Sequence, residues 1–190
     1  MTGWISTRIE KASWTGFIVW TAILFAYSYW AFTLDSPWTR ALEAAGGMLP
    51  ETQPGIPAIE PVRSLDALAA AKANGDYILW QALDIPYTVM NFFFAAIGMA
   101  LGLKALRLDN SALRFLLILP AIYVACELLE DAILAGFAAR LFNPSEGIVL
   151  VQQVATTLKM TSFMPAMLLS VIGVVIALIA AIIRKIRKPA

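Results

Sequence analysis

The chain has 190 residues, of which 60% are hydrophobic and 14% are charged, and its formal net charge is +1. A soluble domain is about half apolar and about a quarter charged, so this composition predicts an integral membrane protein. The only cysteine, Cys126, excludes an intramolecular disulfide. The absence of histidine excludes histidine-ligated haem, histidine-based zinc sites and histidine acid–base catalysis, and no cofactor is expected.

Four apolar runs predict an all-α bundle of four transmembrane helices within a single integral membrane domain, residues 1–190. The expected spans are residues 14–32, 84–103, 115–138 and 162–183. Each is close to the ~20 residues that cross ~30 Å of hydrocarbon. The first span is too long for a signal peptide, and Tyr29-Trp30-Ala31-Phe32 is too bulky for a cleavage site. It is therefore expected to remain as an anchor.

The first two spans are joined by a long loop, residues 34–76, that is expected to carry two short helices. One is 37–45, with Ser36 as its N-cap and a proline at the first helical position. The other is 64–73, which begins with its own capping serine and is ended by Asn74-Gly75. Between them, four prolines predict an extended, irregular stretch: Pro50, Pro54, Pro57 and Pro61.

The basic residues predict the orientation of the spans. Nine of the fourteen lie on one side: Arg8, Lys11, Lys104, Arg107, Arg114, Arg184, Lys185, Arg187 and Lys188. The other side has five: Arg40, Arg63, Lys72, Arg140 and Lys159. Short loops rich in lysine and arginine stay in the cytoplasm, so both termini are expected inside and the long loop outside. The basic tail is expected to meet anionic lipid of the bilayer, and no nucleic acid partner is expected.

The second span places polar and small residues on one helical face. Asp84, Tyr87 and Asn91 share this face near its outer end, and further along the face lie Gly98 and Gly102. Glycines four residues apart allow helix backbones to approach closely. The pair therefore predicts a helix-packing site.

The third span contains carboxylates in an otherwise apolar helix. Glu127, Glu130 and Asp131 fall on one face, and Tyr123 lies one turn away on that face. Ionised groups are costly in hydrocarbon and are rarely placed there without a partner or a role. Lys159 lies at the start of the fourth span at a similar depth, and we expect it to pair with Glu130. Together with Asp84, these residues are expected to form a cluster in the outer half of the membrane, with Tyr87, Asn91 and Tyr123 as hydrogen-bond partners.

This cluster is open to several interpretations. It can be an ionic knot that fixes how the spans pack, a site for a ligand, an ion or a proton, or a carboxylate-based catalytic site. One lysine does not neutralise four carboxylates, so some must be protonated, hydrated or paired with a bound cation. Hard cations such as calcium or magnesium prefer oxygen ligands, but no spacing here is diagnostic of a metal.

Three segments resemble a group of small bacterial four-span membrane proteins that has no assigned activity. The segments are Asp84-Ile85-Pro86-Tyr87, then Leu119-Pro120-Ala121 followed by Glu127-Leu128-Leu129-Glu130-Asp131, and Ala155-Thr156-Thr157-Leu158-Lys159. In that group the second pattern usually ends in Glu-Asn, and here Asp131 stands in the asparagine's place. The resemblance covers roughly residues 77–180. It implies four helices with a polar knot, in the bacterial inner membrane, and it names no substrate.

Two classes of function follow from these features. The first is a non-catalytic accessory or structural subunit of a larger membrane complex, braced by the carboxylate–lysine cluster. It is favoured by the lack of cofactor ligands and by the aromatic-rich first span, which can face lipid or other membrane subunits. The alternative is a binding or transport protein that receives a cation, a proton or a lipid amine at the cluster. A carboxylate-based membrane enzyme is third, and the sequence favours a protein that is not an enzyme.

Overall fold

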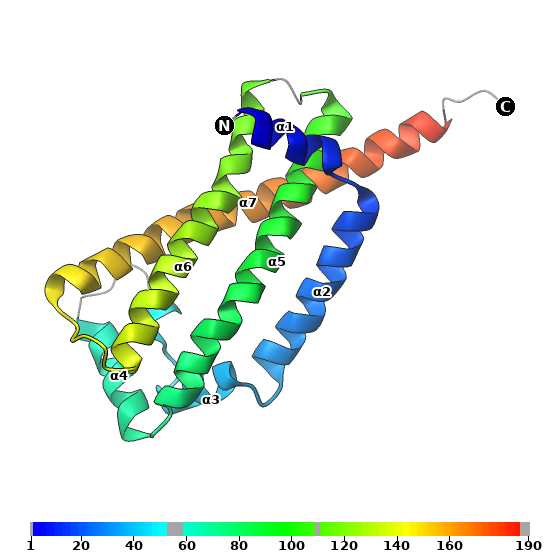
Figure 1. Ribbon diagram of the computed structural model, residues 1–190. Coiled ribbons are helices and arrows are strands. Elements are labelled where there is room, and N and C mark those ends of the chain that lie inside the picture. Colours follow the sequence, from blue (N-terminus) through cyan, green and yellow to red (C-terminus); the bar gives the residue numbers. More distant parts are fainter. Residues whose placement is uncertain (1, 53–58, 109–110, 187–190) are drawn as a thin grey trace. The chain divides into compact units, whose positions relative to one another are not determined.

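The computed structural model describes residues 2–52, 59–108 and 111–186 (Figure 1). The described residues are predominantly helical and contain no β-strand, so the predicted all-α fold is confirmed. The α-helices in chain order are α1 (Thr2–Lys11), α2 (Trp14–Thr33), α3 (Pro37–Ala44), α4 (Ile59–Ala70), α5 (Asn74–Leu106), α6 (Leu119–Ala138) and α7 (Glu146–Ile186). Two 3₁₀ segments accompany them, η1 (Pro50–Thr52) and η2 (Ala112–Ile118).

Four helical stretches among the described residues are long and apolar enough to cross a membrane: Trp14–Ala44, Asn74–Leu106, Ala112–Ala138 and Glu146–Ile186. They contain the four predicted spans. Two helices start earlier than the predicted spans, because α5 begins at Asn74 and α7 begins at Glu146. These additional turns carry polar residues that belong to the cluster described below.

The chain forms two compact units. The termini unit comprises Met1–Leu24, Met90–Ile122 and Ser162–Ala190, and the loop unit comprises Phe25–Val89 and Tyr123–Thr161. The boundary between the units falls within α2, α5, α6 and α7, so each of these helices contributes one part to each unit.

In the termini unit, α5 and α7 approach each other at small residues. A Cβ atom on Gly98 would lie 2.0 Å from the Ser170 hydroxyl oxygen, and one on Gly102 would lie 2.5 Å from the Cα of Gly173. The Ser170 hydroxyl donates to the carbonyl of Phe94 at 3.0 Å. These contacts leave no room for larger residues, so the packing role predicted for Gly98 and Gly102 is confirmed.

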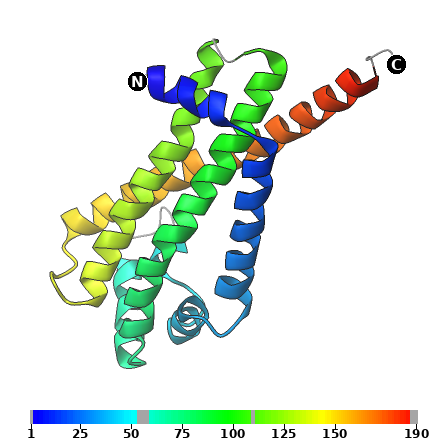
Figure 2. The ribbon, with the colours of Figure 1, turned by 45° about the vertical axis from the view of Figure 1, so that its right-hand side comes forward.

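The sequence analysis missed α1. This amphipathic helix turns away from the direction of α2 (Figure 2) and buries Ile5 and Ile9 in the core of the termini unit, beside Leu117 of η2. Lys104 donates from its Nζ to the carbonyl of Glu10 at 3.2 Å and to that of Ala12 at 3.1 Å. A lysine at the C-terminal end of a helix satisfies carbonyls that have no partner within the helix, so this basic residue fixes where α1 ends.

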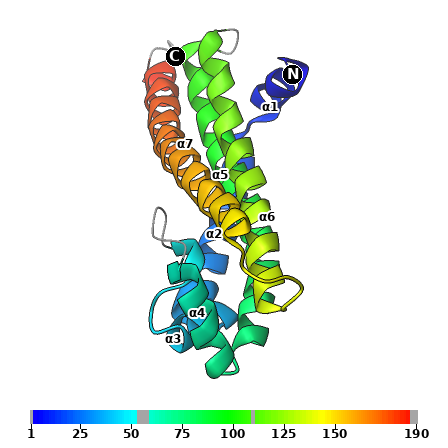
Figure 3. The ribbon, with the colours of Figure 1, turned by 90° about the vertical axis from the view of Figure 1, so that its left-hand side faces the viewer.

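The core of the loop unit joins α3 and α4 to the first turns of α5, the last turns of α6 and the first turns of α7. Figure 3 shows α3 and α4 beside each other. The buried apolar residues shared by these helices include Ala41, Leu68, Tyr77, Leu134 and Val149. The predicted N-cap of α3 is confirmed, because the Ser36 hydroxyl accepts from the Thr39 N–H at 3.2 Å and the Thr39 hydroxyl accepts from the Ser36 N–H at 2.9 Å.

The second loop helix differs from the prediction. Helix α4 begins at Ile59, so Ser64 is a buried residue within it and is not its cap. Pro61 is tolerated because it lies in the first turn, where a backbone N–H has no partner within the helix. Lys72 ends the helix with a φ of 58°, and the Ala73 N–H donates to the Leu68 carbonyl at 2.9 Å. Pro54 and Pro57 lie outside the described residues.

Candidate functional site

Three helices bring buried ionisable side chains together in the loop unit. Helix α5 supplies Asp84, α6 supplies Glu127, Glu130 and Asp131, and α7 supplies Lys159; all are at least nine-tenths buried. Residues three and four apart lie on the same face of a helix, so the three carboxylates of α6 lie on one side of that helix. The predicted cluster is therefore present in the structure.

Lys159 bridges two of these carboxylates. Its Nζ lies 3.1 Å from Oε1 of Glu127 and also contacts Oε2 of Glu130. The expected pairing of Lys159 with Glu130 is confirmed as a contact, and Glu127 is a second partner. All three side chains are buried. Removing one of them should lower the stability of the fold, because it leaves the others charged and away from water.

Glu130 is fully buried and fully supplied with donors. Its Oε1 accepts from Nε2 of Gln152 at 2.9 Å and from the Thr156 hydroxyl, while its Oε2 faces Lys159. Gln152 and Thr156 lie about two and three turns after the start of α7, on the same face as Lys159. An ammonium group and two further donors suit an ionised carboxylate, so this half of the cluster is a complete ion-pair network.

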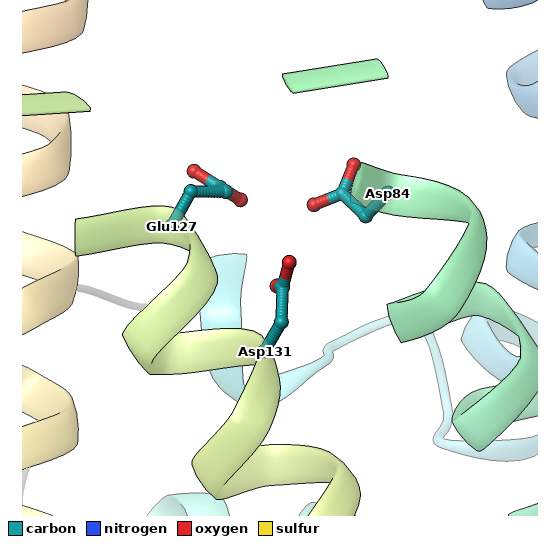
Figure 4. A group of neighbouring side chains, drawn as sticks. All are labelled: Asp84, Glu127 and Asp131. Carbon is teal, nitrogen blue, oxygen red and sulfur yellow. The ribbon is translucent and has the colours of Figure 1, made fainter. Parts of the chain in front are cut away.

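The other half of the cluster is acidic. One carboxylate oxygen from each of Asp84, Glu127 and Asp131 lies within 4.8 Å of the other two, and we call these residues the acidic triad. Figure 4 shows their carboxyl groups converging on one space between α5 and α6. Asp84 and Glu127 form a side-chain hydrogen bond. Two carboxyl groups can form such a bond only when one of them carries a proton.

Asp131, the third member of the acidic triad, has a buried oxygen that receives no hydrogen bond from the described residues. Its side chain is 5% exposed, and its Oδ2 has no hydrogen-bond partner among the described residues. A buried carboxylate oxygen without a donor costs several kcal/mol if the group is charged. Lys159 contacts Glu127 and Glu130, and Oδ2 of Asp131 receives no hydrogen bond from the described residues of this network.

The three residues predicted as hydrogen-bond partners of the cluster, Tyr87, Asn91 and Tyr123, lie in different environments. The Tyr123 hydroxyl lies 3.5 Å from the Thr88 hydroxyl, and both residues are buried in the loop unit. Tyr87 is half-buried, and its ring packs on those of Tyr27 and Phe32, with centroids 6.0 and 5.5 Å apart. Asn91 is buried in the termini unit.

The sequence analysis missed a buried carboxylate in the long loop. Glu51 of η1 accepts from the Tyr77 hydroxyl at 2.7 Å and from Nε2 of Gln81 at 3.4 Å. Its burial raises the pKa of Glu51 to about 7. The charges of Glu130 and Lys159 also act on Glu51, so it belongs to the same polar region. Glu51 lies in a proline-rich segment that is typical of a solvent-exposed loop, and the segment has no helical periodicity that would predict its burial.

The chemistry of the possible ligand atoms limits what this region can hold. The groups that can act as ligands are carboxylates, hydroxyls and amides, which suit protons and hard cations such as Ca²⁺, Mg²⁺ or Mn²⁺. Soft metals prefer sulfur and nitrogen ligands. The acidic triad is therefore an oxygen-only site for a small positive ligand.

Comparisons of the chain with protein-family models, with curated proteins and with solved structures returned no match. The resemblance to small bacterial four-span membrane proteins therefore remains a prediction.

Proposed function

We propose that this protein is a multi-pass membrane protein that binds a small cation, a proton or a metal ion, at its buried carboxylate cluster. The observation that carries the proposal is Asp131, whose Oδ2 is buried and unpartnered and whose carboxyl group lies beside those of Asp84 and Glu127. A cation in this space compensates the acids that Lys159 leaves uncompensated.

An ionic knot that only braces the helices accounts for half of the cluster. Bracing explains Glu130, because Lys159, Gln152 and Thr156 satisfy it completely. It does not explain the acidic triad, where like charges meet without a donor for Asp131. Close carboxylates repel one another unless a proton or a cation lies between them. The deep burial of these side chains also favours a small ion over a lipid headgroup.

We propose that the ligand reaches the cluster from the extracytoplasmic side. The asymmetry of nine basic residues against five supports a topology with both termini in the cytoplasm. The cluster and the helical loop between α2 and α5 belong to the same compact unit. In this arrangement, α3, α4 and η1 form the extracytoplasmic part of the unit that holds the ligand, in the inner membrane of a bacterium.

The proposal is tested by the stability of the purified full-length chain in detergent. A ligand that binds only the folded form stabilises it by RT ln(1 + [L]/Kd), about 2.7 kcal/mol at a hundredfold excess over Kd. We expect thermal unfolding to shift with pH or with added metal ions, and Asp131→Asn to abolish most of the shift. Unfolding that shifts with pH and with metal ions to the same extent in the parent and in Asp131→Asn would refute the proposal.

A second candidate function is that of an accessory subunit in a larger membrane complex. It is supported by α2, whose span is only 11% buried, whereas that of α5 is 50% buried. Ile18, Phe25 and Tyr29 are exposed on α2 and can contact lipid or a partner helix. Mild extraction from native membranes tests this candidate. Co-migration with other chains at a fixed stoichiometry would support it, and migration as a free monomer would refute it.

A further inference from the structure

We infer that the acidic triad is a site for a hard divalent cation of the size of Ca²⁺, and that Lys159 competes with this cation for Glu127. The inference rests on the proposed function, because it specifies which cation the cluster receives. It assigns the ligands as Asp84 of α5 and Glu127 and Asp131 of α6, which share one buried space (Figure 4).

The spacing of the oxygens suits a Ca²⁺ ion. When three oxygens are at most 4.8 Å apart, some point lies within about 2.8 Å of all three, close to the ~2.3–2.6 Å of Ca²⁺–oxygen bonds. A contraction of a few tenths of an ångström, which side-chain rotation can supply, brings the acidic triad to bonding distance. Mg²⁺ requires ~2.0–2.1 Å and near-ideal octahedral geometry, so it demands a larger rearrangement of the same helices.

The ligands also match the ion in type and number. Ca²⁺ takes ~6–8 oxygen ligands and accepts carboxylates that bind through one or both oxygens. Three carboxylates supply up to six oxygens, and the donor-free Oδ2 of Asp131 is available without breaking a hydrogen bond. A divalent ion also offsets two of the negative charges that meet at this space, which a single proton does not.

Glu127 links the cation site to the ion-pair network. It belongs to the acidic triad, and its Oε1 lies 3.1 Å from Nζ of Lys159. A cation on Glu127 weakens its attraction to Lys159, because the two positive charges repel each other across the shared carboxylate. Lys159 keeps Glu130 as its partner. Cation binding therefore shifts Lys159 toward Glu130, and removal of Lys159 is expected to tighten cation binding.

Equilibrium dialysis of the chelator-treated, full-length chain in detergent tests the inference, with radioactive Ca²⁺ as the probe and Mg²⁺ as the competitor. We expect one Ca²⁺ per chain, displaced only by a large excess of Mg²⁺. Loss of an outer-shell partner costs a metal site about 10–100-fold in affinity, so loss of a ligand in Asp131→Asn or Asp84→Asn should cost ~100-fold or more. Lys159→Met should bind Ca²⁺ more tightly than the parent. Glu43→Gln, which removes an exposed acid of α3, should bind like the parent.

Stability measurements distinguish a variant that has lost Ca²⁺ binding from one that has lost its fold, and they distinguish failure of this inference from failure of the proposed function. Without Ca²⁺, Asp131→Asn should be at least as stable as the parent, because it removes a buried group that lacks a donor. A pH response of stability that Asp131→Asn removes, while no Ca²⁺ binds, would overturn the inference and leave a proton as the ligand of the proposed function. The absence of both responses would overturn both. Ca²⁺ binding that is unchanged in Asp131→Asn and Asp84→Asn would place the ion elsewhere and overturn the inference.

Discussion

Replacing Lys159 by methionine leaves two buried carboxylates without their ammonium partner. At the 3.1 Å that separates Lys159 from Glu127, an effective dielectric constant of ~20 gives an attraction of about 5 kcal/mol before desolvation is subtracted. Breaking a buried pair by removal of one partner costs ~3–5 kcal/mol. We expect Lys159→Met to lose this amount, and a chain of this size then melts roughly 6–15 °C lower.

Replacing Glu130 by glutamine is expected to cost less. The amide retains an oxygen that accepts from Gln152 and Thr156, and Lys159 retains Glu127. The loss is that of a charge-assisted hydrogen bond, about 1.5–3 kcal/mol. In Glu130→Gln/Lys159→Met, neither the ammonium nor its closest carboxylate is present, so the double variant should be more stable than the sum of the two losses predicts, by ~0.5–3 kcal/mol.

Thermal and denaturant unfolding of the four proteins in the same detergent, followed by circular dichroism, measures this coupling. The parent, the two single variants and the double variant complete the cycle. Losses that add without coupling would refute the contact between Lys159 and Glu130 as an energetic interaction. An increase in stability of Lys159→Met on addition of Ca²⁺ would show in the same experiment that a cation replaces the missing ammonium.

Three further predictions concern other parts of the chain. Burial raises the pKa of Glu51 to about 7, above its value near 4.5 in the unfolded chain, so the folded form binds the proton more tightly. The free energy of unfolding should therefore fall as the pH rises from about 4.5 to about 7, by roughly 3 kcal/mol. Glu51→Gln should remove this part of the pH dependence and be more stable than the parent at pH 8. Gly102→Ala forces a Cβ to within 2.5 Å of the α7 backbone and should cost ~1–3 kcal/mol in denaturant unfolding; an unchanged free energy of unfolding would contradict the close packing of α5 and α7. In a Cys126→Ser background, Asp35→Cys should react with an impermeant maleimide added outside intact cells and Lys185→Cys only after permeabilisation; the reverse pattern would contradict the proposed topology.

Local patterns predicted the part of the fold that depends on composition and periodicity. The apolar runs predicted the four membrane-length helices, and the spacing of Glu127, Glu130 and Asp131 predicted a common face. The glycine pair of α5 predicted the close approach of α7, because only glycine permits it. The cap at Ser36 was predicted because an N-cap is a property of a few consecutive residues.

The features that the sequence did not predict depend mainly on contacts between residues that are distant in the sequence. Helix α1 is held by Lys104, which lies about ninety residues away in the sequence, and its own sequence is too polar to resemble a span. Glu51 was missed because its burial comes from Tyr77 and Gln81 of α5, which local hydropathy does not show. The start of α4 was missed because a proline in a first turn and a proline in a loop look alike in the sequence.

Infrared difference spectroscopy of the full-length chain tests the central claim most directly, because it reports whether buried carboxyl groups are protonated, ionised or bound to a metal. At neutral pH and without divalent ions, we expect the absorption of a buried protonated carboxyl group from the acidic triad. Addition of Ca²⁺ should remove this absorption and produce that of a metal-bound carboxylate, and Asp131→Asn should strongly reduce the change. Carboxyl absorption that does not change with Ca²⁺, and whose change with pH is the same in the parent and in Asp131→Asn, would contradict the account.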